Sequence, residues 1–210
     1  MMRSLWIGAA VAALVTALCI VTIDQPIARW LATRETYPDV WNQAIAVLEY
    51  PLGIEPWKWS GICVLCAASL ATLLVPRLRS YAAVILIVTL THLLSRNASL
   101  WVKTLTGRYR PGQWIKHGGG ETFWHDGAFS FPSGHVLLFG SIVVPIAIVY
   151  PRARPLLALV AFVIIARVAV NAHFISDVIG GLAVVAAFTA LSALLVRRAL
   201  PSQTLPASLR

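Results

Sequence analysis

Six apolar runs, each close to the length that crosses a lipid bilayer, divide this chain of 210 residues. A helix rises about 1.5 Å per residue and therefore needs about 20 mostly apolar residues to cross the hydrocarbon core. We therefore predict an all-α fold, an integral membrane bundle of six transmembrane helices. The runs cover approximately residues 5–23, 59–75, 81–102, 133–150, 156–170 and 176–196.

The composition favours a membrane protein over a soluble one. Hydrophobic residues make up 59% of the chain, charged residues only 12%, and the mean hydropathy is +0.78. Soluble domains carry about 25% charged residues. The net charge of +9 would suggest nucleic-acid binding if the basic side chains formed a patch on a polar chain. Here they flank the apolar runs, so we expect a membrane-embedded protein with no nucleic-acid partner.

The charges predict how the bundle is oriented. The tight turns at residues 76–79 and 151–155 carry two arginines each, while all eight acidic residues fall at the other ends of the runs. Short loops rich in arginine stay in the cytoplasm. We expect residues 1–200 to form a single membrane domain with an uncleaved first helix, and 201–210 to form a short cytoplasmic tail. Both termini are then cytoplasmic, in a bacterial inner membrane.

Residues 24–58 connect the first two runs and carry mixed charge with several tryptophans. Apolar residues recur at positions 40, 41, 44, 45, 47 and 48, which is helical spacing. This pattern predicts an extracytoplasmic amphipathic segment that lies on the membrane surface. An ordered connecting loop is equally compatible with it. Trp57 and Trp59 flank the second run, as interfacial aromatic residues do.

Three polar clusters interrupt the apolar sequence, and all three fall on the predicted outer side. Residues 103–111 read K-T-L-T-G-R-Y-R-P, residues 132–135 read P-S-G-H, and residues 167–177 read R-V-A-V-N-A-H-F-I-S-D. Each cluster begins or ends an apolar run. We therefore expect the membrane helices to bring them together at one surface, facing the periplasm or the outside of the cell.

The cationic residues of these clusters suit the cleavage of a phosphate ester or anhydride. As such a bond breaks, negative charge shifts to the equatorial oxygens and needs fixed positive donors. Lys103, Arg110 and Arg167 can supply that charge without a metal. Ser133 can cap the helix that follows it, so that the amides of Gly134 and His135 form an anion cradle.

The two histidines of the clusters are candidates for the chemical steps. His173 and Asp177 are four residues apart, which places them on one face of a helix. Asp177 can then orient His173 as the nucleophile, and His135 can act as the general acid. Each residue alone is weak evidence, and the prediction depends on their conjunction on one side of the membrane.

Taken together, the clusters resemble the signature of the type-2 phosphatidic acid phosphatase family. That signature appears here as Lys103-x6-Arg110-Pro111, Pro132-Ser133-Gly134-His135 and Arg167-x5-His173-x3-Asp177. The family's membrane members are similar in having six spans and this order of motifs.

The resemblance implies a mechanism through a phosphohistidine at His173, with Asp177 orienting it and His135 protonating the leaving group. It also implies that no metal or other cofactor is needed, and that the phosphate is held by Lys103, Arg110, Ser133, Gly134 and Arg167. The third motif usually begins with serine, whereas this chain has Ala166. The missing hydroxyl should weaken phosphate binding or the positioning of Arg167 by about 1 kcal/mol.

Two features outside the signature bear on the substrate. Arg96 and His92 precede Lys103 by seven and eleven residues, which keeps the three on one helical face. We predict that Arg96 lines the substrate cavity and contacts a second phosphate or a headgroup; a hydrogen bond between helices is the alternative. The glycine-rich loop 112–131 predicts a mobile lid with interfacial tryptophans, and its histidines have no metal-site spacing.

A phosphate site at the membrane surface predicts a lipid phosphate or diphosphate as substrate, and undecaprenyl diphosphate is the first expectation. Phosphatidylglycerophosphate, phosphatidic acid and lipid A phosphate remain open, because nothing in the motifs recognises the lipid tail. A vanadate-dependent haloperoxidase would share the signature, but six spans argue against that soluble class. A catalytically inactive lipid-binding or transport protein is a further alternative. The sequence does not indicate the oligomeric state.

Overall fold

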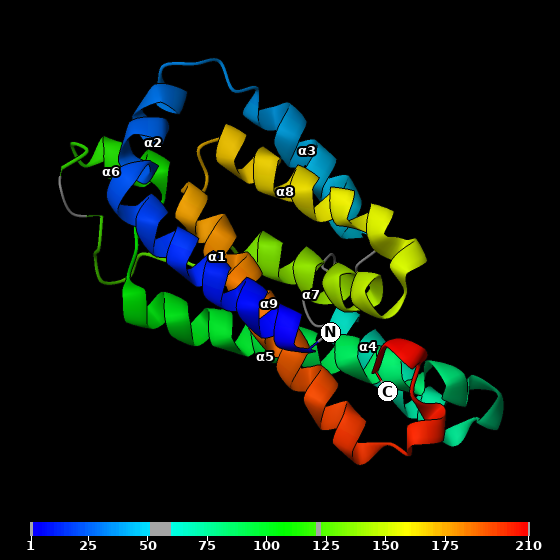
Figure 1. Cartoon of the computed structure of the whole chain (residues 1–210). Coiled ribbons are helices and arrows are strands. Elements are labelled where there is room, and N and C mark those ends of the chain that lie inside the picture. Colours follow the sequence, from blue (N-terminus) through cyan, green and yellow to red (C-terminus); the bar gives the residue numbers. More distant parts are fainter. Residues whose placement is uncertain (1, 51–59, 121–122, 210) are drawn as a thin grey trace.

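Helices dominate the computed structural model, which describes residues 2–50, 60–120 and 123–209 (Figure 1). Within these ranges β-type pairing is limited to two isolated bridges, so the predicted all-α fold is confirmed. The α-helices are α1 (Met2–Thr22), α2 (Asp24–Ala32), α3 (Pro38–Glu49), α4 (Ser60–Leu74), α5 (Ala82–Thr106), α6 (Pro111–Lys116), α7 (Gly134–Val149), α8 (Leu157–Ala169) and α9 (Ile175–Ala199). Short 3₁₀ helices are η2 (Pro76–Tyr81), η3 (Pro151–Leu156), η4 (Ser202–Thr204) and η5 (Ala207–Leu209).

Among the described residues, three helical segments are long and apolar enough to cross a membrane: Met2–Thr22, Pro76–Thr106 and Ile175–Ala199. The other predicted spans correspond to α4, α7 and α8, which have 15, 16 and 13 residues. A helix of that length reaches only about 20–24 Å, whereas the hydrocarbon core is about 30 Å thick. Length and composition therefore support three of the six predicted spans, and the number six stays a prediction.

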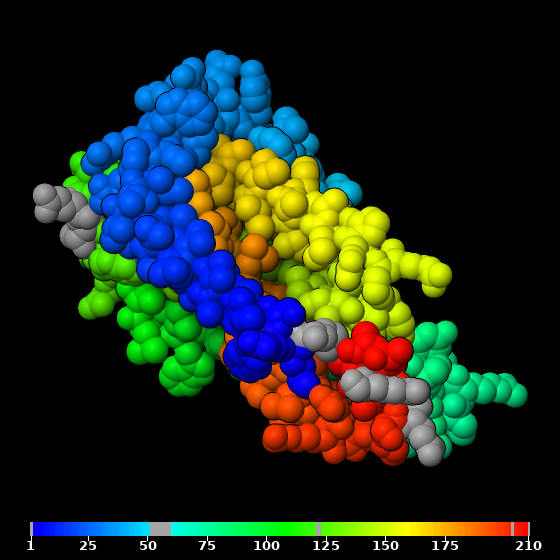
Figure 2. Space-filling view, in the orientation of Figure 1, coloured from blue at the N-terminus to red at the C-terminus, as the bar shows by residue number. Residues whose placement is uncertain are grey.

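Helix α9 lies at the centre of the bundle and packs against α1, α5 and α7 (Figure 1). Helix α5 also packs against α4, and α7 packs against α8. Figure 2 shows α1 crossing one face of the molecule with its outer side uncovered. Large apolar side chains on that helix are exposed, namely Trp6, Ile7, Val11, Leu14, Leu18 and Val21. Such a surface is suited to lipid rather than to water.

Two glycines let α7 and α9 approach closely. A Cβ atom added to Gly181 would lie 3.1 Å from Val136, and one added to Gly140 would lie 3.1 Å from Val185. Contacts this short are tighter than most Cβ contacts, so a side chain at either position would have to displace its valine neighbour. The first turns of the two helices, where two of the polar clusters begin or end, are therefore held close together.

The helix predicted within residues 24–58 is present as α3, which packs against α8. Ile45 on its inner face is only 2% exposed, and the Trp41 ring lies 5.7 Å from the Phe162 ring. Its position on a membrane surface stays a prediction. The two flanking tryptophans, Trp57 and Trp59, lie outside the described residues.

The loop after α5 differs from the predicted lid. Its first part is α6, and Trp114 within that helix is 1% exposed rather than interfacial. The indole packs with Ala28, Phe123 and Phe174, and its Nε1–H donates to the carbonyl of Gly120. The prediction was wrong for Trp114 because the sequence did not show that α2 and the turn before α9 would cover it.

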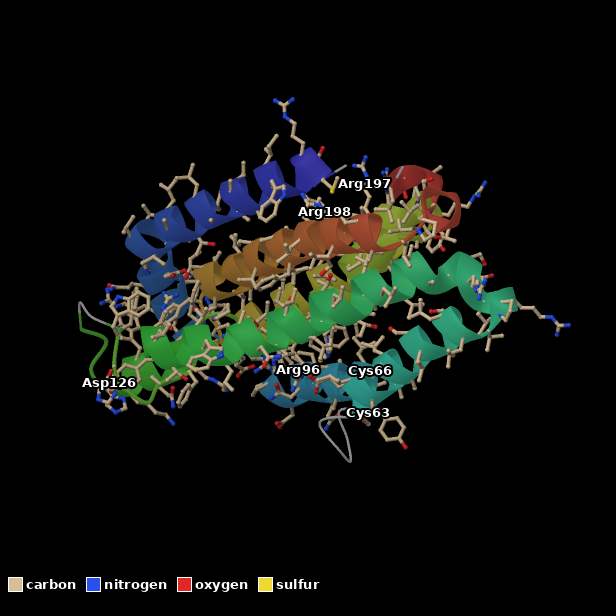
Figure 3. All side chains as sticks on the ribbon, turned by 90° about the horizontal axis from the view of Figure 1, so that it is seen from below. Cys63, Cys66, Arg96, Asp126, Arg197 and Arg198 are labelled. Atoms are coloured by element: carbon tan, nitrogen blue, oxygen red, sulfur yellow. The ribbon has the colours of Figure 1, made fainter. Side chains whose placement is uncertain are left out.

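The predicted charge asymmetry is visible along the bundle. Figure 3 shows Asp126 at one end and Arg197 and Arg198 toward the other, beside the start of α1. The polar clusters begin at the Asp126 end, after α5 and before α7. Which side of a membrane each end faces stays a prediction.

Replacing Gly181 by leucine should separate α7 from α9, because the new side chain would meet Val136 and the backbone of Ser133. Overpacking of this kind costs about 1–3 kcal/mol. We expect a lower melting temperature in detergent than for the wild-type protein. Gly8→Leu is the matched control, since no atom lies within 4 Å of a Cβ at Gly8. Equal melting temperatures for the two variants would contradict this packing.

Candidate active site

The first cluster brings a lysine and an arginine to the end of α5. Lys103 lies in the last turn, and its Nζ is 3.4 Å from the position of a Cβ on Gly134 at the start of α7. Gly107 then ends the helix with a left-handed backbone (φ 53°), where a Cβ would lie 2.6 Å from the carbonyl oxygen of His125. Only glycine fits this turn, which leads the chain to Arg110 at the start of α6.

The second cluster forms the beginning of α7. Ser133 occupies the position before the first helical turn, and its backbone N–H donates to the carbonyl of Asp177 over 3.0 Å. Its hydroxyl does not cap the helix, contrary to expectation. It is buried and has no hydrogen-bond partner within the described part of the chain. The Ser133 side chain accepts no hydrogen bond from the backbone amides of the first turn. Those amides and the Ser133 hydroxyl therefore remain available to an anion.

The third cluster supplies the pair of His173 and Asp177. The Nδ1 of His173 lies 3.2 Å from the Oδ2 of Asp177, and both side chains are almost completely buried. His173 precedes the first residue of α9, so it lies in the turn after α8 rather than on a helix face as the spacing suggested. The pairing forms nevertheless. A proton on Nδ1 that is donated to Asp177 leaves Nε2 with the lone pair that a nucleophile needs.

The carboxylate of Asp177 collects hydrogen bonds from several segments. Its Oδ2 accepts from the hydroxyl of Ser130 over 2.5 Å and from the backbone N–H of Phe174 over 3.0 Å, in addition to His173. Its Oδ1 accepts from Arg108 over 2.7 Å. Buried charges are tolerated only with such partners. The orientation of Asp177 is therefore fixed from all sides.

Arg167 and His135 complete the arrangement, and α3 covers both. Arg167 lies in the last turn of α8, and its Nη1 donates to the Oδ1 of Asn42 over 3.0 Å. The Nε2 of His135 lies 3.3 Å from Glu49. His135 is also within electrostatic range of His173 and of the three cations, Arg167, Arg110 and Lys103.

All residues predicted for the phosphate site thus lie around one point, between the ends of α5 and α8 and the starts of α7 and α9. Three cations, the amides of a helix start and two imidazoles converge there, which suits a tetrahedral oxyanion. The Nε of Arg167 is buried and, in the part of the chain that the structure describes, has no hydrogen-bond partner. An unsatisfied buried donor at this position favours an anionic ligand.

Sequence reasoning missed Arg108, Asp24, Asn42 and Glu49. Arg108 lies inside the first cluster, but its side chain is buried against Asp24 and Asp177, whereas Arg110 is exposed. Its backbone forms the two β-bridges, with Trp124 and Phe129. Asp24, Asn42 and Glu49 lie within residues 24–58, where the sequence shows no catalytic motif. The polar or charged nature of each side chain was the signal that the sequence offered.

Arg96 and His92 behave differently from each other. The Nδ1 of His92 lies 2.8 Å from the hydroxyl of Ser141, which joins α5 to α7. Arg96 comes from the middle of α5 (Figure 3) and is half-buried. It makes no hydrogen bond or ion pair with any described residue. His92 therefore forms a hydrogen bond between helices. The same kind of contact was the alternative explanation for Arg96, which forms none with the described residues.

Comparison with known proteins agrees with this geometry. The model of the PAP2 superfamily matches residues 77–201, which is more than half of the chain. The chain therefore belongs to the PAP2 superfamily, and the predicted resemblance to the type-2 phosphatidic acid phosphatases is confirmed.

Two relatives carry the name lipid A 1-phosphatase. The protein of Rhizobium johnstonii is 38% identical over 101 residues, and that of Rhizobium etli is 37% identical over 101 residues. The matched segments cover 46% of this chain, 41% of the first relative and 44% of the second. The comparison thus spans less than half the length of each relative. No solved structure gives a significant match to the chain.

Proposed function

We propose that this protein is a membrane phosphatase that hydrolyses a lipid phosphate or diphosphate through a covalent intermediate at His173. The convergence of Lys103, Arg110 and Arg167 on the buried pair of His173 and Asp177 carries this proposal. The membership of the PAP2 superfamily supports the same reaction class.

Binding and attack follow from the positions of these groups. The three cations and the first-turn amides of α7 hold the phosphate oxygens, so that charge is stabilised where it develops. The Nε2 of His173 attacks phosphorus, the P–N bond forms, and the P–O bond to the lipid breaks. His135 donates a proton to the departing oxygen.

The second half of the reaction reverses these roles. His135, now neutral, removes a proton from a water molecule, whose oxygen attacks the phosphorus of the phosphohistidine. The P–N bond breaks, the electron pair returns to His173, and inorganic phosphate leaves. The hydrogen bond from Nδ1 to Asp177 stabilises the positive charge that His173 carries between the two steps.

The membrane setting is part of the proposal. We infer six spans in a bacterial inner membrane, with both termini in the cytoplasm and the site facing the periplasm or the outside. The arginine turns at η2 and η3 and the acidic residues near the site support this orientation. Spans α4 and α8 are short. A locally thinner bilayer and tilting of the neighbouring helices would accommodate their length.

The names of the two relatives favour lipid A 1-phosphate as the substrate, ahead of undecaprenyl diphosphate. A specific observation keeps a diphosphate as the second candidate. Arg96 is a half-buried cation in a membrane helix, on the face of α5 that also carries Lys103. Charged residues at such depth usually face a polar cavity or a substrate.

Replacing His173 by alanine should abolish phosphate release, because it removes the imidazole that is proposed to attack phosphorus. We expect a fall in kcat of roughly 10⁴-fold or more. The measurement is phosphate release by the purified protein in detergent from lipid A, undecaprenyl diphosphate and phosphatidic acid, with and without a chelator. The exposed His117 provides the control variant His117→Ala. Full activity of His173→Ala would refute the assigned nucleophile, and an inactive wild-type protein would favour the lipid-binding alternative.

The acidity of His173 predicts the pH dependence. Burial lowers the pKa of His173 below its ordinary value of 6.5, the cations Arg110 and Arg167 lower it too, and the hydrogen bond to Asp177 opposes them. Attack needs the neutral ring, which persists to lower pH when the pKa is lowered. We expect kcat/KM to fall on the acid side with a midpoint below pH 6.5. A profile of kcat/KM against pH checks this, and a midpoint above that value would contradict it.

The variant Arg96→Gln tests for the second phosphate. Loss of a charge-assisted hydrogen bond costs about 1.5–3 kcal/mol, so we expect kcat/KM for a diphosphate lipid to fall roughly 10- to 100-fold. The value for a monophosphate lipid should change little. Arg79→Gln, at the exposed cytoplasmic end of the same helical segment, is the control. Equal losses on both substrates would exclude contact with a second phosphate.

A further inference from the structure

The guanidinium of Arg108 joins the catalytic aspartate to a second carboxylate at the start of α2. We propose that Asp24 and Arg108 are positioning residues for the reaction: Asp24 fixes Arg108, Arg108 fixes Asp177, and Asp177 orients His173. This inference rests on the proposed function and deepens it, because it assigns a role to two residues outside the signature.

The geometry of the Arg108 guanidinium supports this series of contacts. The Nη1 of Arg108 donates to Asp177 Oδ1 over 2.7 Å, and its Nη2 donates to Asp24 Oδ2 over 2.6 Å. The side chains of all three residues are 0% exposed. A planar guanidinium with both ends occupied cannot rotate without breaking one ion pair.

Ser176 ties the same groups together. Its hydroxyl accepts from Arg108 Nη1 over 2.5 Å and donates to Asp24 Oδ2. Its backbone N–H donates to Asp24 Oδ1 over 3.0 Å. Both carboxylate oxygens of Asp24 therefore accept hydrogen bonds. They hold Asp24 against the first turn of α9 at Ser176, the residue before Asp177.

Aromatic rings close the remaining sides of the guanidinium. Its central carbon lies 4.2 Å from the centre of the Phe123 ring and 4.4 Å from that of Phe174. Stacking of this kind excludes water and strengthens the ion pairs through the low local dielectric. Phe174 follows His173 directly, so the same ring also fixes the backbone of the nucleophile.

The charges of the cluster suit the covalent step. Two carboxylates and one guanidinium leave one net negative charge beside His173. When Nε2 bonds to phosphorus, the ring keeps its proton on Nδ1 and becomes positively charged. A fixed negative charge nearby stabilises that state more than the neutral ring before the reaction. Removing the charge of Asp24 leaves the pair of Arg108 and Asp177 neutral, so we expect the effect on kcat rather than on substrate binding.

A merely structural role for Asp24 is the competing explanation, since it also pins α2 to α9. The variant Asp24→Asn separates the two roles. Asparagine has the same size and keeps an oxygen that accepts from the N–H of Ser176, but it has no charge to hold Arg108. If Asp24 only connects the helices, the variant should retain nearly full activity.

The experiment measures kcat, KM and the melting temperature of the full-length protein in detergent, with whichever lipid phosphate the wild type hydrolyses. We expect kcat of Asp24→Asn to fall about 10²-fold, the scale of a slightly misplaced catalytic group, with KM close to that of the wild type. The exposed Asp39 gives the control Asp39→Asn, which should leave both constants unchanged. A wild-type kcat for Asp24→Asn would overturn the proposal.

A milder variant covers the case in which Asp24→Asn does not fold. Ser176→Ala keeps every charge and removes only the hydroxyl between Asp24 and Arg108. We expect a smaller fall in kcat, roughly tenfold for one hydrogen bond to charged groups, at unchanged KM. An unchanged kcat in this variant would overturn the proposal in the same way.

A spectroscopic measurement separates this proposal from the proposed function. The Nδ1 proton of His173, hydrogen-bonded to Asp177, should give a strongly deshielded NMR resonance that is missing in His173→Gln. Asp24→Asn should shift it, and Asp39→Asn should not. If the wild-type protein releases no phosphate from any lipid, the proposed function fails. The Nδ1 resonance then tests by itself whether Asp24 positions His173. An unaltered resonance in Asp24→Asn would then overturn the positioning role.

Discussion

The buried carboxylate of Asp177 is the interaction on which the rest of the site depends. It accepts from Ser130, His173, the Phe174 amide and Arg108, which come from three separate segments of the chain. A carboxylate inside a helical bundle would be strongly unfavourable without these partners. The same contacts that make its burial possible also fix the direction in which it holds the imidazole. Stability of the bundle end and alignment of the proposed nucleophile therefore have a common origin.

The sequence predicted the helical class, the meeting of the polar clusters and the three cations Lys103, Arg110 and Arg167 of the candidate phosphate site, but it missed Arg108. These features depend on apolar length and on fixed spacing, both of which are local. Side-chain direction was less predictable. Ser133 was expected to cap α7, but its hydroxyl has no hydrogen-bond partner among the described residues, and His173 lies in a turn rather than on a helix. Such details depend on how segments distant in sequence pack, which spacing alone does not specify.

Contributions from the first fifty residues were the least visible in the sequence. Asn42 contacts Arg167, Glu49 contacts His135, and Asp24 contacts Arg108. All three precede residue 77, where the match to the family begins. A single polar residue gives no periodic signal, so only the folded arrangement reveals its partner. The segment that the family shares is therefore surrounded by side chains that this chain supplies from elsewhere.

The bond from the amide of Ser133 to the carbonyl of Asp177 joins the two parts of the site through the main chain. Main-chain bonds do not depend on which side chains the helices carry. The spacing between the proposed anion cradle and the turn that carries His173 is therefore set through the backbone. Substitutions on the outer surfaces of α7 and α9 would leave this bond in place.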